Sequence, residues 1–377
     1  MKPKVIHFVE TFLARSEVFI YNYISAHSQW QPVVLTKRRI NDSEFPVNDI
    51  IEISSPITKR SPRWWKHTAT ETLTGRSPWH RTAEKSLRRV GPSLLHAHFG
   101  HVAYGLLPIK KRLNLPLVTS FYGYDMSVLP RQAKWRDRFS RLFAEGDLFL
   151  VEGPCMRQRL VELGAAPEKV AIQRIAINPD NYPSWKPSSQ PTVLFVGRFT
   201  EKKGLLNALR AFDYIRKRRP ELTLRVIGDG EEREAAQILI REKGMNGDVV
   251  FLGIRSHSDV IQELSAAHVL IHPSMTATNG DTEGGAPTVL LEAQAIGVPI
   301  VSTLHADIPN VARSPRGIFL SPERDVISLA NYLESALQLR EGTDATYVRE
   351  FHNVAREILL LEAKYQDCLT QSAMMGL

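Results

Sequence analysis

The chain contains almost no cysteine: Cys155 and Cys368 are its two thiols in 377 residues. Two thiols so far apart match neither the ligand spacing of a zinc site nor a disulfide framework. No apolar run approaches the roughly 18 to 20 residues that a membrane-spanning helix needs. Residues 1–4 lead into an apolar strand pattern without the features of a secretory signal. These absences argue against a transmembrane protein and a disulfide-stapled secreted domain, and we expect a protein of the reducing cytoplasm.

Length and composition favour two domains. A chain of 377 residues is long for one domain, and its hydrophobic content of 43% is ample for two cores.

Short apolar segments alternate with helical patterns in both halves of the chain. Such alternation predicts parallel, doubly wound sheets, in which ligands bind at the carboxyl ends of the strands. The fold class is therefore α/β, with two Rossmann-like sheets. The expected strands lie at residues 4–9, 33–36, 94–100, 116–121 and 148–151 in the first half, and at 192–197, 222–228, 249–253, 269–273 and 298–302 in the second.

Two carboxylates, Glu283 and Glu292, flank a turn of small residues at 284–287 that opens a helical pattern. Unshielded backbone N–H groups at a helix N-terminus can hold an anion, while a carboxylate can accept hydrogen bonds from sugar hydroxyls. A nucleotide sugar needs both. The alternative is an ordinary surface helix preceded by a glycine-rich loop.

A tight loop after the strand at 192–197 carries Arg198 and Lys203 near its two ends. The forked guanidinium and the compact ammonium together suit a diphosphate.

These motifs resemble the C-terminal half of the family 4 retaining glycosyltransferases, in particular bacterial enzymes that build exopolysaccharides of the colanic acid type. The resemblance rests on VGRFTEKKGL, IGDGEE, VLIHPS, DTEGGAPTVLLEAQAIGVPIVST and HADIPNVA, and more weakly on SEVFIYNYI, LLHAHFG and VTSFYGYD in the first half. It implies the GT-B fold, in which two Rossmann-like domains face a cleft. We expect an acceptor-binding domain at residues 1–180, a nucleotide-sugar domain at 181–346 and a final helix, about 347–377, that packs back on the first domain.

The resemblance also implies roles for individual residues. The catalytic set is Arg198, Lys203 and Glu283. The donor-binding set is Gly197, Gly228, Ile254, Arg255, Gly284, Gly285, Ala286, Pro287, Thr288 and Glu292. The acceptor-side set is Ser16, Glu17, His98, Tyr122 and Asp125. For Ser16 and Glu17, an ordinary helix N-terminus is the alternative.

The chain departs from the family pattern twice. Tyr122 stands where many relatives carry a histidine, and a tyrosine cannot titrate near neutral pH. Eight residues separate Glu283 from Glu292, whereas the family usually has seven. We expect one extra residue in the turn, with Glu283 still reaching the sugar, because loop insertions cost little.

His96 and His98 lie on the same side of an expected strand. A metal site would need a third ligand, and none is evident at a useful spacing. A hydrogen-bonded histidine near the core is the simpler interpretation of His96.

Positive charge is concentrated in the first half. Residues 1–185 carry 27 Lys and Arg against 16 Asp and Glu, a net charge of +11, whereas the remainder carries 21 against 24, a net charge of −3. The densest stretch, residues 59–89, also contains Trp64, Trp65 and Trp79. Basic residues with tryptophan suit an anionic membrane surface; the alternative is a solvated loop with tryptophans packed onto the domain. No nucleic-acid motif accompanies the charge.

The sequence therefore predicts transfer of a hexose from a UDP- or GDP-linked sugar to a saccharide acceptor. We expect this acceptor to be lipid-linked and the enzyme to work at the inner face of the cytoplasmic membrane. Retention of configuration is implied, and we expect neither metal ion nor cofactor. Two alternatives are a sugar-nucleotide epimerase of similar fold and a non-catalytic relative that binds nucleotide sugars or carbohydrate.

Overall fold

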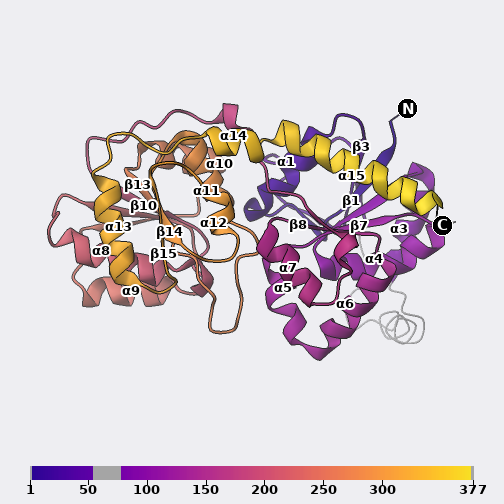
Figure 1. Cartoon of the computed structure of the whole chain (residues 1–377), viewed down its shortest axis with the longest axis horizontal. Coiled ribbons are helices and arrows are strands. Elements are labelled where there is room, and N and C mark those ends of the chain that lie inside the picture. The colour runs from indigo at the N-terminus through magenta and orange to yellow at the C-terminus, as the bar shows by residue number, and fades with distance from the viewer. Residues whose placement is uncertain (1, 54–77, 375–377) are drawn as a thin grey trace.

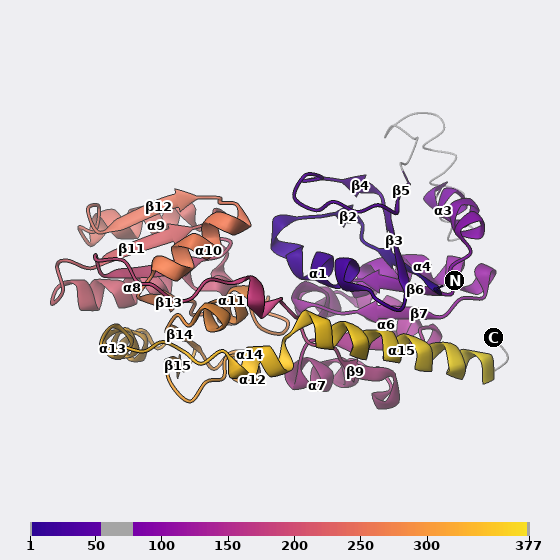
Figure 2. The same ribbon diagram turned by 90° about the horizontal axis from the view of Figure 1, so that it is seen from above.

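The computed structural model describes residues 2–53 and 78–374, which form two α/β units lying side by side (Figures 1 and 2). In each unit the strands of the main sheet run parallel. The predicted fold class, two doubly wound parallel sheets, is confirmed. Within the described residues no helix combines the length and the apolar character needed to cross a membrane.

The first unit is built on a sheet whose described strands follow the order β5-β3-β1-β6-β7-β8-β9. Side chains alternate between the two faces of β1: Ile6 and Phe8 join the core beneath α4 and α6, while Val5 joins the core beneath α15. The strands are β1 (Lys4–Phe8), β3 (Gln31–Thr36), β5 (Ile50–Glu52), β6 (Leu94–His98), β7 (Leu117–Ser120), β8 (Leu148–Val151) and β9 (Val170–Ile172); β2 (Thr11–Phe12) pairs separately with β4 (Arg38–Arg39). The helices are α1 (Val18–Ala26), α3 (Pro78–Val90), α4 (Gly100–Leu113), α5 (Gly123–Ser127), α6 (Ala133–Glu145) and α7 (Pro154–Glu162).

The second unit has the strand order β12-β11-β10-β13-β14-β15. Val193 and Phe195 of β10 face one core, and Leu194 faces the other. The strands are β10 (Thr192–Val196), β11 (Thr223–Ile227), β12 (Val249–Gly253), β13 (Val269–Ile271), β14 (Ile300–Thr303) and β15 (Ile318–Ser321). The helices are α8 (Leu205–Arg216), α9 (Arg233–Glu242), α10 (His257–Ala266), α11 (Thr288–Ile296), α12 (Ile308–Val311) and α13 (Val326–Leu337).

In both sheets the strand order reverses direction beside the first strand of the unit. The reversal lies between β1 and β6 in the first sheet and between β10 and β13 in the second. Loops leave in opposite directions at such a point, and the crevice left between them is where doubly wound sheets bind ligands. Each unit therefore has one topologically favoured site.

The end of the chain returns to the first unit. The single long helical pattern expected there is two helices, α14 (Thr346–Phe351) and α15 (Val354–Met374), and α15 runs along the first unit (Figure 2). Tyr365 is fully buried, and Glu362 accepts hydrogen bonds from the backbone N–H groups of residues 28–30. Buried contacts of this kind join the two ends of the chain.

The basic segment predicted at residues 59–89 lies largely outside the described residues, and α3 is its described part. Arg81, Lys85 and Arg88 are exposed on α3. Trp79, in contrast, is 9% exposed and stacks on Phe8 with their ring centroids 5.4 Å apart. The assignment of Trp79 to a membrane interface is therefore wrong, because burying the indole in the core removes it from the surface.

Candidate active site

A cavity of about 1400 Å³ lies between the two units. It is lined from the first unit by η1 (Arg15–Glu17), α1 and the ends of β7 and β8, and from the second by the ends of β10 and β13 and the start of α11. The second unit thus contributes the ends of β10 and β13, the two strands between which its strand order reverses. Fourteen of the predicted residues line this cavity: Ser16, Glu17, Tyr122, Gly197, Arg198, Lys203, Arg255, Glu283, Gly284, Gly285, Ala286, Pro287, Thr288 and Glu292.

Lys203 and Glu283 form the charged centre of the cavity. After β10 the chain makes a short turn, η5 (Glu201–Lys203), and Gly204 adopts the left-handed conformation (φ 72°) that allows α8 to begin. Lys203 Nζ lies 2.8 Å from Glu283 Oε1. Burial alone would raise the pKa of Glu283, but the charges of Lys203 and Lys202 lower it to about 2. Glu283 is therefore an anion at neutral pH, held beside a cation.

Lys202 was missed by the sequence analysis. Its ammonium donates hydrogen bonds to Asp281 Oδ1 (3.1 Å) and to the carbonyl of Thr282 (3.0 Å). The two consecutive lysines thus hold the loop that carries Glu283. Their adjacency in the sequence was the available signal, but it does not say which lysine points to which carboxylate.

Two histidines and a serine complete the surroundings of Glu283. Ser274 donates to Glu283 Oε1 (3.0 Å), and its hydroxyl lies 2.9 Å from His272 Nδ1. The backbone N–H of Glu283 donates to His305 Nε2 (3.1 Å). Burial lowers the pKa of His272 to about 3, so its ring is neutral. Before any ligand binds, Lys203 and Ser274 thus hold the side chain of Glu283, and His305 holds its backbone.

Glu292 lies in the first turns of α11, and its side chain is 6% exposed. His257 Nε2 lies 2.8 Å from Glu292 Oε1, and this hydrogen bond raises the pKa of His257. Glu283 lies in the loop before α11, and both carboxylates line the same cavity.

Glu17 and Arg198 face one another from the two sides of the cavity. Burial raises the pKa of Glu17 to about 7, and the charge of Arg198 opposes that rise. Ser16 and Glu17 lie in η1, and neither side chain caps η1 or α1. The ordinary capping interpretation of these two residues is therefore wrong, because Glu17 occupies the N-cap position of α1 without making a capping hydrogen bond.

Four predicted residues do not line the cavity. Gly228 packs against the backbone of Gly197, where any side chain would overlap Gly197 O, and Ile254 is 66% exposed. Asp125 turns inward and accepts hydrogen bonds from the N–H groups of Gly100 (2.6 Å) and Tyr122 (2.9 Å). His98 lies behind Tyr122. The strand-end rule correctly located their loops, but side-chain direction in those loops depends on packing.

Glu152 is the carboxylate that sequence reasoning missed. It directly follows β8, and its Oε2 accepts a hydrogen bond from the N–H of Gly285 in the other unit (2.6 Å). Burial, and then the nearby carboxylates of Asp307 and Glu283, raise the pKa of Glu152 to about 8. Close by, Gly123 and Gly284 touch backbone to backbone, so a side chain at either position would overlap the other unit. The backbone N–H of Gly285, in the small-residue turn, is thus already hydrogen-bonded to a carboxyl group of the first unit.

Two family models match the chain: Glycosyltransferase Family 4 over residues 18–181, and Glycosyl transferases group 1 over residues 181–350. Together they cover both units and meet at the connection between them.

Two curated relatives are similar in sequence. The chain is 30% identical over 248 residues to WcaL of Escherichia coli K12, which is named as a glycosyltransferase of colanic acid biosynthesis; the match covers 64% of this chain and 61% of the relative. It is 31% identical over 252 residues to the amylovoran biosynthesis glycosyltransferase AmsK of Erwinia amylovora, covering 65% and 60%. The match thus spans about three fifths of each relative's length.

The crystal structure of HepE from Anabaena in complex with UDP and glucose has a similar fold. Its TM-score to this chain is 0.79 at 14% identity, with 97% of this chain and 100% of that chain covered.

Proposed function

Since the chain belongs to the family 4 glycosyltransferases and has the GT-B fold, we propose that it transfers a hexose from a nucleoside diphosphate sugar to a saccharide acceptor. The observation that carries the proposal is the pairing of Lys203 with Glu283 beside Arg198 and the small-residue turn at 284–287, inside the cavity between the units. It brings cations, the backbone N–H groups of Gly284 and Ala286 and an anionic carboxylate together at one strand-reversal point.

The charges suggest how the donor lies. Arg198, Lys203 and the backbone N–H groups of Gly284 and Ala286 are placed to bind the diphosphate. The N–H of Gly285 is already bonded to Glu152, and Pro287 has none. Glu292, oriented by His257 through one oxygen, is placed to accept hydrogen bonds from ribose hydroxyls with the other. Glu283 is then left for a hydroxyl of the transferred sugar, because Ser274 and Lys203 hold its carboxylate at the cavity wall.

For the chemical step we propose same-face substitution with retention. Cleavage of the bond between the sugar and the phosphate leaves negative charge on the diphosphate, which Arg198 and Lys203 stabilise. The leaving phosphate oxygen takes the proton of the acceptor hydroxyl as the new glycosidic bond forms. The two cations supply charge that a metal ion would otherwise supply, so the step is proposed to need no metal.

Tyr122 is not proposed as a base. Its hydroxyl lies 2.8 Å from His98 Nδ1, and burial raises its pKa well above the usual value. Its ring, which packs on Phe19 and Phe99, instead forms part of the cavity wall.

The acceptor is proposed to be a lipid-linked saccharide at the inner face of the cytoplasmic membrane. The two relatives are named for roles in polysaccharide biosynthesis, and Arg81, Lys85 and Arg88 give α3 an exposed basic surface. Attraction of such residues to anionic lipid is worth about 1 kcal/mol each.

Thermal shift with a panel of UDP- and GDP-linked sugars tests the donor. Stabilisation by one nucleotide sugar, followed by its transfer to a lipid-linked saccharide, is the expected result. Turnover of the nucleotide sugar without an acceptor would indicate an epimerase. Binding with neither transfer nor hydrolysis would indicate a non-catalytic relative.

A further inference from the structure

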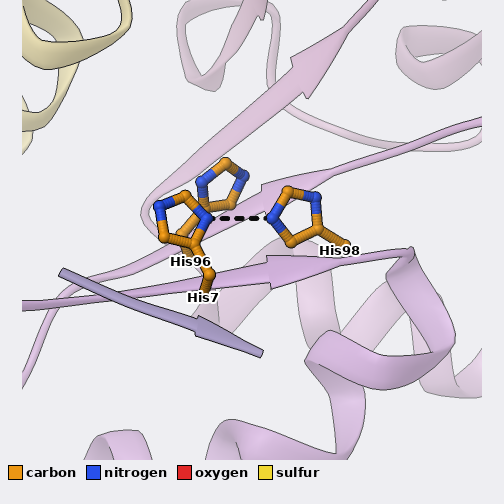
Figure 3. A group of neighbouring side chains, drawn as sticks. All are labelled: His7, His96 and His98. Carbon is orange, nitrogen blue, oxygen red and sulfur yellow. Dashed lines mark hydrogen bonds between the residues drawn. The ribbon is translucent and has the colours of Figure 1, made fainter. Parts of the chain in front are cut away.

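The strand-reversal point of the first sheet carries three buried histidines (Figure 3). His96 and His98 come from β6, and His7 from the neighbouring strand β1, where it lies opposite His96 in the parallel ladder. The sequence analysis found no third ligand for a metal site. Strand pairing supplies one, from a segment 89 positions away from His96.

The ring nitrogens are close enough to share one ion. One ligand atom from each ring lies within 4.8 Å of the other two, and His7 Nδ1 is 3.0 Å from His98 Nε2. Two nitrogens on a tetrahedral zinc ion, each about 2.0 to 2.1 Å from the metal, stand roughly 3.3 Å apart. The 3.0 Å between His7 Nδ1 and His98 Nε2 is close to this separation, and His96 needs a side-chain rotation to join the pair. The three residues are at most 2% exposed.

Each ring is also held at its other nitrogen, as ligating histidines usually are. His7 Nε2 lies 2.9 Å from His27 Nε2, and His27 Nδ1 donates to Glu362 Oε1 (3.0 Å). His98 Nδ1 lies 2.8 Å from the hydroxyl of Tyr122. His96 Nδ1 lies 2.5 Å from the hydroxyl of Tyr365, and its Nε2 lies 2.8 Å from that of Ser120. Either nitrogen can therefore bind an ion while the other keeps its hydroxyl partner.

Metal ligation needs neutral imidazoles. Burial lowers the pKa of all three rings, that of His98 to about 3, and neighbouring rings lower them further. Among residues 2–53 and 78–374, no carboxylate contacts the three rings directly; Glu362 acts through His27.

We propose that His7, His96 and His98 bind one divalent transition-metal ion with a preference for imidazole, of which zinc is the first candidate. The ion replaces the hydrogen bond between His7 Nδ1 and His98 Nε2. Because Glu362 can only accept, the hydrogens of the neutral chain point towards it, and His98 Nε2 carries the shared one. On binding, that hydrogen moves to His98 Nδ1 and is donated to the oxygen of Tyr122, so no proton is lost. The ion joins β1 to β6 and, through His27 and Glu362, to α15.

The site is independent of the proposed transfer chemistry. It belongs to the first unit and lies behind Tyr122, whereas the charged centre of the cavity is built on the second unit. A metal here would stabilise the protein and would take no part in bond breaking.

The test is metal binding to the full chain after treatment with a chelator and dialysis. Calorimetric titration with Zn²⁺ is expected to give one ion per chain, and Co²⁺ to give the visible absorption of a site with nitrogen ligands. His7→Gln and His98→Gln should each weaken binding by more than the roughly 10- to 100-fold that loss of an outer-shell partner costs. His268→Gln, in the second unit, is the matched control and should bind as the wild type does.

Absence of stoichiometric binding to the wild-type chain would overturn the proposal and leave a purely hydrogen-bonded network. Equal binding by all three variants would also overturn it. If a variant does not fold, as judged by circular dichroism, electron spin-echo spectroscopy on the Cu²⁺-loaded wild type decides: three coordinated imidazoles support the site, and fewer contradict it.

Discussion

Replacing Lys203 by alanine should reduce kcat/KM for the donor by about 100-fold or more. In the free protein Lys203 is the main charge that holds the pKa of Glu283 at about 2 rather than 4.5. At 1.36 kcal/mol per pKa unit, the net lowering corresponds to roughly 3 kcal/mol, to which both Lys203 and Lys202 contribute and which burial of the carboxylate opposes. Without the lysine, a buried carboxylate faces the diphosphate unneutralised, and a stabilising charge is missing from the transition state. Removing one preorganised charge stabiliser from a transition state costs roughly 2.7 to 4 kcal/mol, which is on the order of 100- to 1,000-fold in rate.

The assay is the initial rate of sugar transfer at varied donor concentration, with a thermal melt to verify folding. Lys217→Ala, which removes an exposed lysine just after α8, is the matched control and should leave the rate unchanged. Lys203→Ala has two consequences: the diphosphate loses a cation, and the carboxylate of Glu283 loses its partner. The double variant Lys203→Ala, Glu283→Gln separates them, because it removes the unpaired carboxylate charge without restoring the cation. A double variant that recovers the wild-type rate would refute the assignment of Lys203 to the diphosphate and leave it as a partner of Glu283 alone.

Four further outcomes are expected. Glu292→Ala should bind free nucleoside diphosphate about tenfold more weakly by calorimetry, since charge-assisted hydrogen bonds to ribose contribute roughly 1.5 to 3 kcal/mol; unchanged affinity would contradict the ribose assignment. Donor affinity should fall as the pH rises through about 8, because Glu152, neutral below its raised pKa, then gains a negative charge beside the diphosphate. Glu152→Gln should abolish this fall, and the same fall in donor affinity in both proteins would exclude Glu152 as its cause. Binding to anionic vesicles in flotation should weaken with salt, because exposed charges are screened within about 10 Å at 0.1 M, and should be lost when Arg60, Arg63, Lys66 and Arg81 are neutralised together; no binding even at low salt would favour a soluble acceptor. Trp79→Ala should lower the free energy of unfolding by about 3 to 5 kcal/mol and leave vesicle binding of the folded protein unchanged, since the indole is buried; weaker flotation at full stability would restore its membrane role.

Local pattern was sufficient for the fold and for the charged centre of the cavity. Strands buried on both faces are continuous apolar runs, and the polar residues that follow them must lie at the carboxyl edge of a parallel sheet. Arg198 and Lys203 follow from that rule, whereas Glu283 and Glu292 follow from the small-residue turn that opens α11; each of the four lines the cavity.

Side-chain direction was not available from the sequence. Asp125 satisfies two buried N–H groups instead of facing the cavity, and Trp79 fills the core instead of the surface. Both residues stand in sequence patterns that permit either direction. Packing decides between them: Asp125 accepts hydrogen bonds from N–H groups that would otherwise be unpaired, and Trp79 fills an apolar gap in the core.

Contacts between distant segments were decided by tertiary structure alone. Glu152 meets Gly285 because the two units close on one another, and His7 meets His96 and His98 because β1 pairs with β6. The sequence by itself determined which residues end the strands, since that depends on neighbours along the chain. Which strand ends face each other depends on strand order and on the packing of one unit against the other, and neither leaves a mark in the local pattern.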